Sequence, residues 1–167
     1  MATPTPQQVL TELDAAALAV REQTDALGAL TAIGAAMDRL IGSRMLTFLH
    51  FDLPRFDMVR LYCTLPERYA IGAHKQMRRG RWYDCLVERG MPFIASGDDE
   101  MRATFGDHAE LAAIGVTSTL CTPVRYLGRT LGTMNLNGAA GRYGEREAQL
   151  AQPFATLAAP IFLAHKT

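Results

Sequence analysis

The stretch that decides the fold is V-T-S-T-L-C-T-P-V-R-Y-L-G-R-T-L-G-T-M-N-L-N, residues Val116–Asn137. Two runs rich in β-forming residues, Thr117–Tyr126 and Arg129–Asn137, meet at Leu127-Gly128. Glycine supplies the positive φ that a tight connection needs, and Leu-Gly predicts a type II turn or a bulge-bearing loop. Both runs carry apolar residues on both faces, which is typical of strands in the middle of a covered sheet. The rest of the chain must therefore supply edge strands and covering helices.

The composition is that of an ordinary globular chain: 167 residues, 49% hydrophobic and 20% charged. This length predicts one domain. The formal net charge is zero, so bulk charge favours neither nucleic acid nor an anionic membrane as a partner. The chain shows no apolar run of the roughly 20 residues that a spanning helix needs and no signal-peptide pattern. Three cysteines without C-x-x-C spacing indicate a reducing, cytoplasmic location.

The N-terminal part has the periodicity of two helices. Thr5-Pro6 predicts a helix start, because threonine can cap and proline is favoured at the first helical position. After a second cap at Thr24 or Asp25, the run Leu27–Ile41 repeats apolar residues at helical spacing. We expect the two segments to form either two helices or one interrupted helix.

The middle of the chain alternates β-rich and irregular segments. Arg44–Asp52 and Met58–Leu65 predict a second hairpin, and Tyr69–Ile71 predicts a short strand. The expected shorter elements are a helix at Trp82–Arg89, an edge strand at Met91–Ala95, and lid helices at Asp98–Phe105 and Asp107–Ile114.

The closing segment Glu145–His165 predicts a helix that Pro153 and Pro160 kink or split. The order of elements then predicts an α+β sandwich. Its central antiparallel sheet has about six strands, with the terminal helices on one face and a lid of short helices and loops on the other. We expect a single domain over residues 1–167, with 1–26 as a helical extension and 27–165 as the core.

An ordered series of motifs surrounds the central hairpin. C-L-V-E-R-G-M-P (Cys85–Pro92), F-G-D (Phe105–Asp107) and L-A-A-I-G (Leu111–Gly115) precede it. The pattern G-x-x-S-x-L-x-x-P-V is filled by Gly115, Ser118, Leu120, Pro123 and Val124, and G-x-x-x-G-x-x-x-L by Gly128, Gly132 and Leu136. Over most of residues 27–164 this series resembles a GAF domain.

The resemblance implies a small-molecule sensor or regulatory module without catalysis of its own, whose pocket lies between sheet and lid. It names no cofactor or ligand. It also implies a homodimer formed through the terminal helices, whose apolar residues exceed what one sheet face covers. The apolar residues that predict this contact are Leu10, Leu13, Leu27, Leu30, Leu157 and Ile161.

Two alternatives stay open: a thiol enzyme similar to free methionine-(R)-sulfoxide reductase, and an interaction module without a pocket. The reductase needs cysteines in the lid. Cys85 falls near one such place, but residues 96–115 contain none, and Cys121 lies in an apolar run, which predicts a buried, inert thiol. We therefore predict no catalytic residues.

Metal and phosphate sites are not indicated. The four histidines are scattered without metal-ligand spacing, so we predict no metal site. The triplet Asp98-Asp99-Glu100 is interpreted as the acidic start of a helix. The basic run Arg78-Arg79-Gly80-Arg81 is interpreted as a solvated loop.

Alternation along the hairpin places the candidate ligand-binding residues. Gly132, Met134 and Leu136 share a face that suits packing on the terminal helices. The residues that alternate with them, Leu131, Thr133 and Asn135, are then expected to face the lid. The sequence leaves open whether Ser118 and Leu120, or Thr119 and Cys121, look to that side. A buried asparagine must pair its amide, either with the lid backbone or with a ligand.

Aromatic residues would give such a pocket its walls, unless they are plain core. The predicted ligand-binding set is Tyr62, Trp82, Tyr83, Phe105, Ser118, Thr133 and Asn135.

Overall fold

A six-stranded antiparallel sheet in the order β3-β2-β1-β6-β5-β4 forms the centre of the computed structural model, which describes residues 3–165. Residues 1–2 and 166–167, the ends of the expected domain, lie outside the described residues. The strands are β1 (Met45–Asp52), β2 (Asp57–Cys63), β3 (His74–Gln76), β4 (Phe93–Ser96), β5 (Ser118–Tyr126) and β6 (Arg129–Gly138). The predicted α+β sandwich with a central sheet is thus confirmed.

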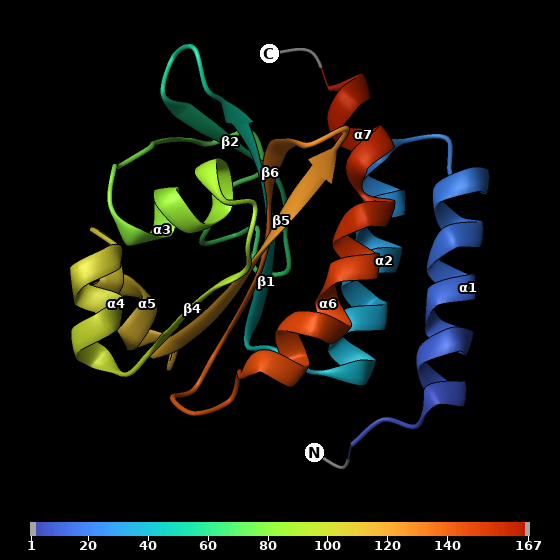
Figure 1. Ribbon diagram of the computed structural model, residues 1–167, viewed down its shortest axis with the longest axis horizontal. Coiled ribbons are helices and arrows are strands. Elements are labelled where there is room, and N and C mark those ends of the chain that lie inside the picture. The colour runs from blue at the N-terminus through green and yellow to red at the C-terminus, as the bar shows by residue number, and fades with distance from the viewer. Residues whose placement is uncertain (1–2, 166–167) are drawn as a thin grey trace.

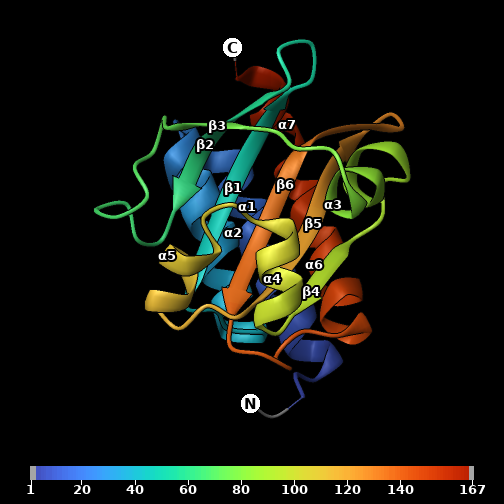
Figure 2. The same cartoon turned by 90° about the vertical axis from the view of Figure 1, so that its left-hand side faces the viewer.

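Helices cover both faces of this sheet. They are α1 (Pro6–Glu22), α2 (Ala26–Leu40), α3 (Arg81–Tyr83), the π-helical turn η1 (Asp84–Glu88), α4 (Asp98–Thr104), α5 (His108–Ala113), α6 (Glu145–Leu157) and α7 (Ala159–Ala164). Figure 1 shows α2, α6 and α7 against one face, with α1 outside them. Figure 2 shows α3, α4 and α5 in front of the opposite face, where they form the lid. None of the helices within residues 3–165 is long and apolar enough to cross a membrane.

The N-terminal helices begin where the capping residues predict. Thr5 and Gln8 form a capping box at the start of α1, which pairs two backbone N–H groups that the helix itself leaves without acceptors. The Asp25 side chain accepts a hydrogen bond from the Gly28 N–H and caps α2. The two segments are therefore separate helices, and Asp25 rather than Thr24 is the second cap.

The central hairpin turns more tightly than expected. Leu127 and Gly128 both have positive φ, 46° and 78°, and Tyr126 pairs with Arg129. Positive φ at both central residues defines a type I′ turn, whose twist matches that of the flanking strands. The prediction of a type II turn or a bulged loop is therefore wrong at the turn itself. A register shift follows in β6, where Leu131 has no partner of its own.

The helix-side core confirms which face of β6 packs against the terminal helices. Met134 and Leu136 are fully buried in one cluster with Phe154 and Phe162. A β-carbon added at Gly132 would lie 2.4 Å from the Phe162 ring and 2.1 Å from the Leu49 carbonyl oxygen. Glycine therefore allows α7 to approach the backbone of the sheet closely. Leu131, which the alternation places on the lid face, packs against this helix-side cluster instead.

One local expectation needs correction, and the expected split of the closing helix is confirmed. The third strand is His74–Gln76 rather than Tyr69–Ile71, because residues 65–73 turn back on themselves and Gly72 adopts a φ of 82°. At the C-terminus Pro153 remains inside α6. The helix divides at Ala158, and Pro160 occupies the first turn of α7, where a missing N–H costs little.

Candidate functional site

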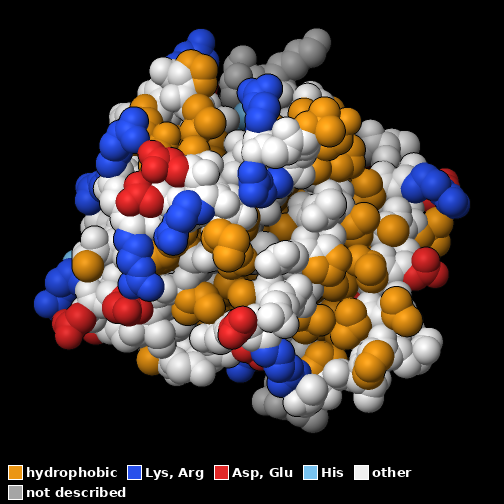
Figure 3. All heavy atoms as spheres, in the orientation of Figure 1, with side chains coloured by type: hydrophobic (Ala, Val, Ile, Leu, Met, Phe, Trp, Pro, Cys, Tyr) orange, Lys and Arg blue, Asp and Glu red, His pale blue; other side chains and the backbone are white. Residues whose placement is uncertain are grey.

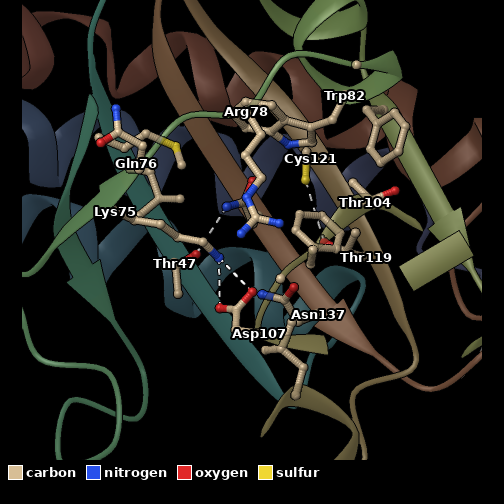
Figure 4. Close-up of a pocket in the computed structure, with 18 of the residues that line it drawn as sticks. Thr47, Lys75, Gln76, Arg78, Trp82, Thr104, Asp107, Thr119, Cys121 and Asn137 are labelled. Atoms are coloured by element: carbon tan, nitrogen blue, oxygen red, sulfur yellow. Dashed lines mark hydrogen bonds and ion pairs between the residues drawn. The ribbon is translucent and has the colours of Figure 1, made fainter. Parts of the chain in front are cut away.

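A cavity of about 570 Å³ lies between the sheet and the lid. Its floor comes from β1, β2, β5 and β6, and its walls from residues 74–82 and from the α4–α5 region (Figure 4). A volume of this size is within the range of small-ligand sites in proteins. The cavity is where the resemblance to GAF domains places a pocket.

Alternate residues of the central strands form the floor. From β1 these are Met45, Thr47 and Leu49, from β5 Thr119 and Cys121, and from β6 Asn135 and Asn137. Leu120, between the two β5 residues, belongs to the helix-side core. The register that the sequence left open is therefore the one that turns Thr119 and Cys121 toward the lid.

The amide of Asn135 is held by threonines of the sheet. Its Nδ2 donates to the Thr47 hydroxyl at 3.3 Å, and the Thr133 hydroxyl lies 2.8 Å from its Oδ1. The neighbouring Asn137 donates from Nδ2 to the Met45 carbonyl at 3.1 Å. The protein partners of the Asn135 amide are therefore threonines of the sheet and not the lid backbone. The side chain nevertheless lines the cavity.

Trp82 and Phe105 stand at the cavity wall, as predicted for them. Trp82 packs against Phe51 with ring centroids 5.6 Å apart, and the Lys75 ammonium lies 5.8 Å from the centroid of Phe105. Tyr83 is buried behind this wall against Phe56, with ring centroids 5.4 Å apart. It is part of the lid core and does not line the cavity.

Tyr62 and Ser118 do not lie where the sequence predicts. Tyr62 packs against Phe48 in the helix-side core, with ring centroids 6.1 Å apart. The reason is a β-bulge: Leu49 pairs with Arg60 and Phe48 with Tyr62, so one extra residue reverses the alternation of β2. Ser118 is fully buried and donates to the Ala95 carbonyl at 2.9 Å, so it joins β5 to the edge strand β4.

Thr133 supports the floor without lining the cavity. Its hydroxyl lies 3.2 Å from the Thr122 carbonyl as well as near the Asn135 amide, and the side chain is fully buried. Of the seven predicted residues, the structure brings Trp82, Phe105 and Asn135 together around the cavity.

Charged residues, most of them from the irregular middle of the chain whose arginines the sequence offers to an anionic or polar ligand, surround the cavity. Arg60, Lys75, Arg78, Arg79 and Arg81 all line it. The basic composition of residues 75–81 is the sequence signal for them, but an irregular segment has no periodicity that shows which of its side chains point to the cavity. The lining carboxylates are Glu100, Asp107 and Glu110. Glu100 lies in the first turn of α4, as the interpretation of the acidic triplet expects.

The three cysteines are buried and form no disulfide. Burial raises the pKa of the Cys121 thiol to about 11, against smaller opposing effects of Thr119, Trp82 and Lys75. Burial likewise raises the pKa of Cys63. Cys85 lies in the lid core, where Arg89 Nη2 is 2.6 Å from its Sγ. The predicted burial of Cys121 is confirmed, and a raised pKa disfavours the thiolate that thiol chemistry needs.

Among residues 3–165, no three histidine, cysteine or acidic side chains come together as a metal site requires. His74 is the one of the four histidines at the cavity wall, and its Nδ1 contacts an Asp57 carboxylate oxygen at 2.5 Å.

Solved structures similar to this chain share its whole fold. The GAF domain of a phosphoenolpyruvate-protein phosphotransferase from Coxiella burnetii superposes with a TM-score of 0.78 at 17% identity, covering 96% of each chain. The phycoerythrobilin-bound GAF domain of a cyanobacterial phytochrome superposes with a TM-score of 0.70 at 15% identity, covering 93% of this chain and 94% of that one. Identities this low show the fold alone.

An enzyme has the same fold. Free methionine-R-sulfoxide reductase from Neisseria meningitidis, in complex with its substrate, gives a TM-score of 0.66 at 14% identity, covering 98% of this chain and 95% of that one. The search of curated proteins finds no match.

The family model described as GAF domain matches residues 23–162. This range contains the whole sheet, the lid and the cavity between them. The chain therefore belongs to the GAF domain family.

Proposed function

We propose that this chain is a regulatory GAF module that binds a small molecule in the cavity and has no catalysis of its own. The observation that carries the proposal is the cavity itself. Its lining combines apolar side chains such as Met45, Leu49 and Trp82 with the fixed amides of Asn135 and Asn137. Apolar walls with a few oriented polar groups are the usual composition of a small-ligand site.

The cysteines support binding over thiol catalysis. A catalytic thiol is accessible and has a lowered pKa, whereas Cys63 and Cys121 are buried with raised values. Free thiols also fit the reducing cytoplasm that we propose as the location of the protein.

We also propose that the module acts as a homodimer through its terminal helices. Leu10, Leu18 and Leu27 of α1 and α2 are about half exposed or more, at 60%, 51% and 48%. Figure 3 shows apolar side chains gathered over the side of the molecule where α1 and α6 lie. Leu30, on the inner side of α2, is fully buried in the helix-side core. It therefore does not belong to this surface, although the sequence suggested that it does.

A thermal-shift screen against a metabolite library tests the binding proposal. A ligand at a hundredfold excess over its Kd stabilises the native state by about 2.7 kcal/mol. A Thr119→Phe variant places a ring on the cavity floor, and Thr24→Phe makes the same change at an exposed residue that does not line the cavity. We expect compounds that stabilise the wild type and Thr24→Phe but not Thr119→Phe. Hits that stabilise all three proteins equally, or no hits at all, would support an interaction module without a ligand.

A further inference from the structure

The side chains around the cavity carry more positive than negative charge. Five lysine and arginine residues line it, against the three carboxylates of Glu100, Asp107 and Glu110. The whole chain is formally neutral, so this local excess is a property of the cavity and not of the composition. A local excess of one sign raises the concentration of ligands of the opposite sign.

Some of these cations already have carboxylate partners. Lys75 Nζ lies 2.7 Å from both carboxylate oxygens of Asp107, and Arg81 Nη1 lies 3.7 Å from Glu100. Arg79 lies over the Tyr83 ring, 4.8 Å from its centroid, and 3.6 Å from a Glu88 oxygen. These three cations are therefore largely compensated within the lid.

Arg60 and Arg78 are not compensated in this way. Arg60 Nη1 donates to the Ala70 carbonyl at 3.1 Å, its guanidinium lies over Tyr69, and its Nε has no partner among residues 3–165. For Arg78, no described residue forms an ion pair or side-chain hydrogen bond with the guanidinium. Both side chains line the cavity.

Arg78 is also the better placed of the two. Its side chain extends from the segment before α3 into the cavity, toward Asn137 and the Lys75–Asp107 pair (Figure 4). A β-carbon added at Gly106 would lie 2.8 Å from Arg78 Nη2, so the glycine between α4 and α5 leaves room for the guanidinium. The guanidinium at the cavity has five N–H donors and cannot lose its charge.

We infer that the ligand carries an anionic group, a carboxylate, phosphate or sulfonate, joined to an apolar or aromatic body. The inference rests on the proposed function. Arg78 binds the anionic group, because a guanidinium forms two parallel hydrogen bonds to such groups. The body lies against Trp82 and Phe105, and the Asn135 and Asn137 amides form the polar floor.

The test uses two fluorescent probes with the same aromatic body. Anilinonaphthalene sulfonate carries an anionic group, and phenylnaphthylamine is its neutral counterpart. Each is titrated into the full chain, into Arg78→Met and Arg78→Lys, and into Arg129→Met as the matched control. Arg129 is an exposed arginine that does not line the cavity. Thr119→Phe and Ala103→Trp, which fill the cavity from its floor and from α4, report whether the probes bind there. Circular dichroism and melting temperature establish that each variant is folded.

We expect the wild type to bind the sulfonate about tenfold more tightly than the neutral probe, a difference of about 1.4 kcal/mol. Arg78→Met should remove that preference without weakening the binding of the neutral probe. Arg78→Lys should retain part of it, and Arg129→Met all of it. Both cavity-filling variants should weaken the binding of both probes.

The other outcomes separate the two proposals. If both probes bind in the cavity and Arg78→Met changes neither, the anionic inference is overturned and the small-molecule module remains. If neither probe binds, or if a folded cavity-filling variant binds both probes as the wild type does, the cavity is not the binding site and both proposals are overturned.

Discussion

Asn135 is a polar side chain buried in the middle of the sheet, where its amide joins β6 to β1. Its partners are the hydroxyls of Thr47 and Thr133, and only 8% of the residue surface is exposed. A buried amide without partners is costly, so the threonines stabilise its presence on the cavity floor. They also fix the orientation of the amide at the cavity floor.

The first prediction concerns this amide. Replacing Asn135 by leucine removes the hydrogen-bond partner of the Thr47 and Thr133 hydroxyls. We therefore expect the free energy of unfolding to fall by about 1–2 kcal/mol. For a chain of this length, that corresponds to a fall in Tm of about 2–8 °C. Chemical denaturation of Asn135→Leu, Thr47→Val and the double variant measures the coupling. Strict additivity would mean that the hydrogen bond contributes nothing.

The second prediction concerns the cysteines. Because Cys63, Cys85 and Cys121 are buried, and burial raises the pKa of Cys121 to about 11, we expect little reaction with an aromatic disulfide reagent at about pH 8. Denaturant should expose all three thiols. A variant with serine or alanine at the three positions should keep any ligand response. Rapid native labelling, or loss of a thiol-dependent reductase activity in the variant, would contradict the proposed function.

At the scale of elements, α7 is held to the sheet by aromatic and histidine contacts. The centroid of the His50 ring on β1 lies 5.7 Å from the centroid of the Phe162 ring and 5.1 Å from that of the His165 ring. Burial lowers the pKa of His50, and His165 lowers it further, while Asp52 and the Phe162 backbone oppose both effects. We therefore expect the docking of the last helix to depend on the charge of His50.

The third prediction follows from the direction of that pKa shift. In the unfolded chain the pKa of His50 is about 6.5, and in the folded chain it is lower. The unfolded state therefore binds more protons in this window, and stability falls as the pH drops below about 6.5. We expect Tm to decrease between about pH 7 and about pH 5, and to decrease less in His50→Leu.

The control for this prediction is His108→Leu, the same change on α5 of the lid. It should retain the wild-type dependence of Tm on pH, since His108 does not contact α7 in the described contacts. Parallel curves for His50→Leu and the wild type would show that His50 does not contribute to acid sensitivity.

At the scale of the whole molecule, the two faces of the sheet have different surroundings. The lid carries most of the charged pairs near the cavity, whereas α1 presents exposed leucines and a groove shared with α6, lined by Leu10, Leu13 and Leu157 among others. Exposed apolar area of this kind marks an interaction surface.

The fourth prediction tests the proposed dimer. Light scattering should show a dimer at micromolar concentration, and Leu10→Glu with Leu27→Glu should yield a folded monomer, because charges at a self-complementary interface repel. Leu127→Glu is the matched control: that leucine is 84% exposed at the tip of the β5–β6 hairpin. A monomeric wild type, or a dimer that the double variant leaves intact, would contradict the proposal.

The sequence by itself determined the architecture. Helix caps such as Thr5, the alternation of the β6 strand and the glycine at position 128 act over a few residues, so their structural consequences can be worked out locally. They predicted the order of elements, the sheet covered on both sides, and the face of Met134 and Leu136. The same alternation placed Asn135 on the cavity side.

The tertiary structure alone decided which residues share the cavity. The bulges that turn Tyr62 and Leu131 to the helix side arise from pairing between strands, and pairing is not encoded in the period of one strand. The cations of residues 75–81 reach the cavity only because an irregular segment packs over the sheet. Local patterns therefore specified the sheet and its covering helices, while long-range packing assembled the charged wall of the site.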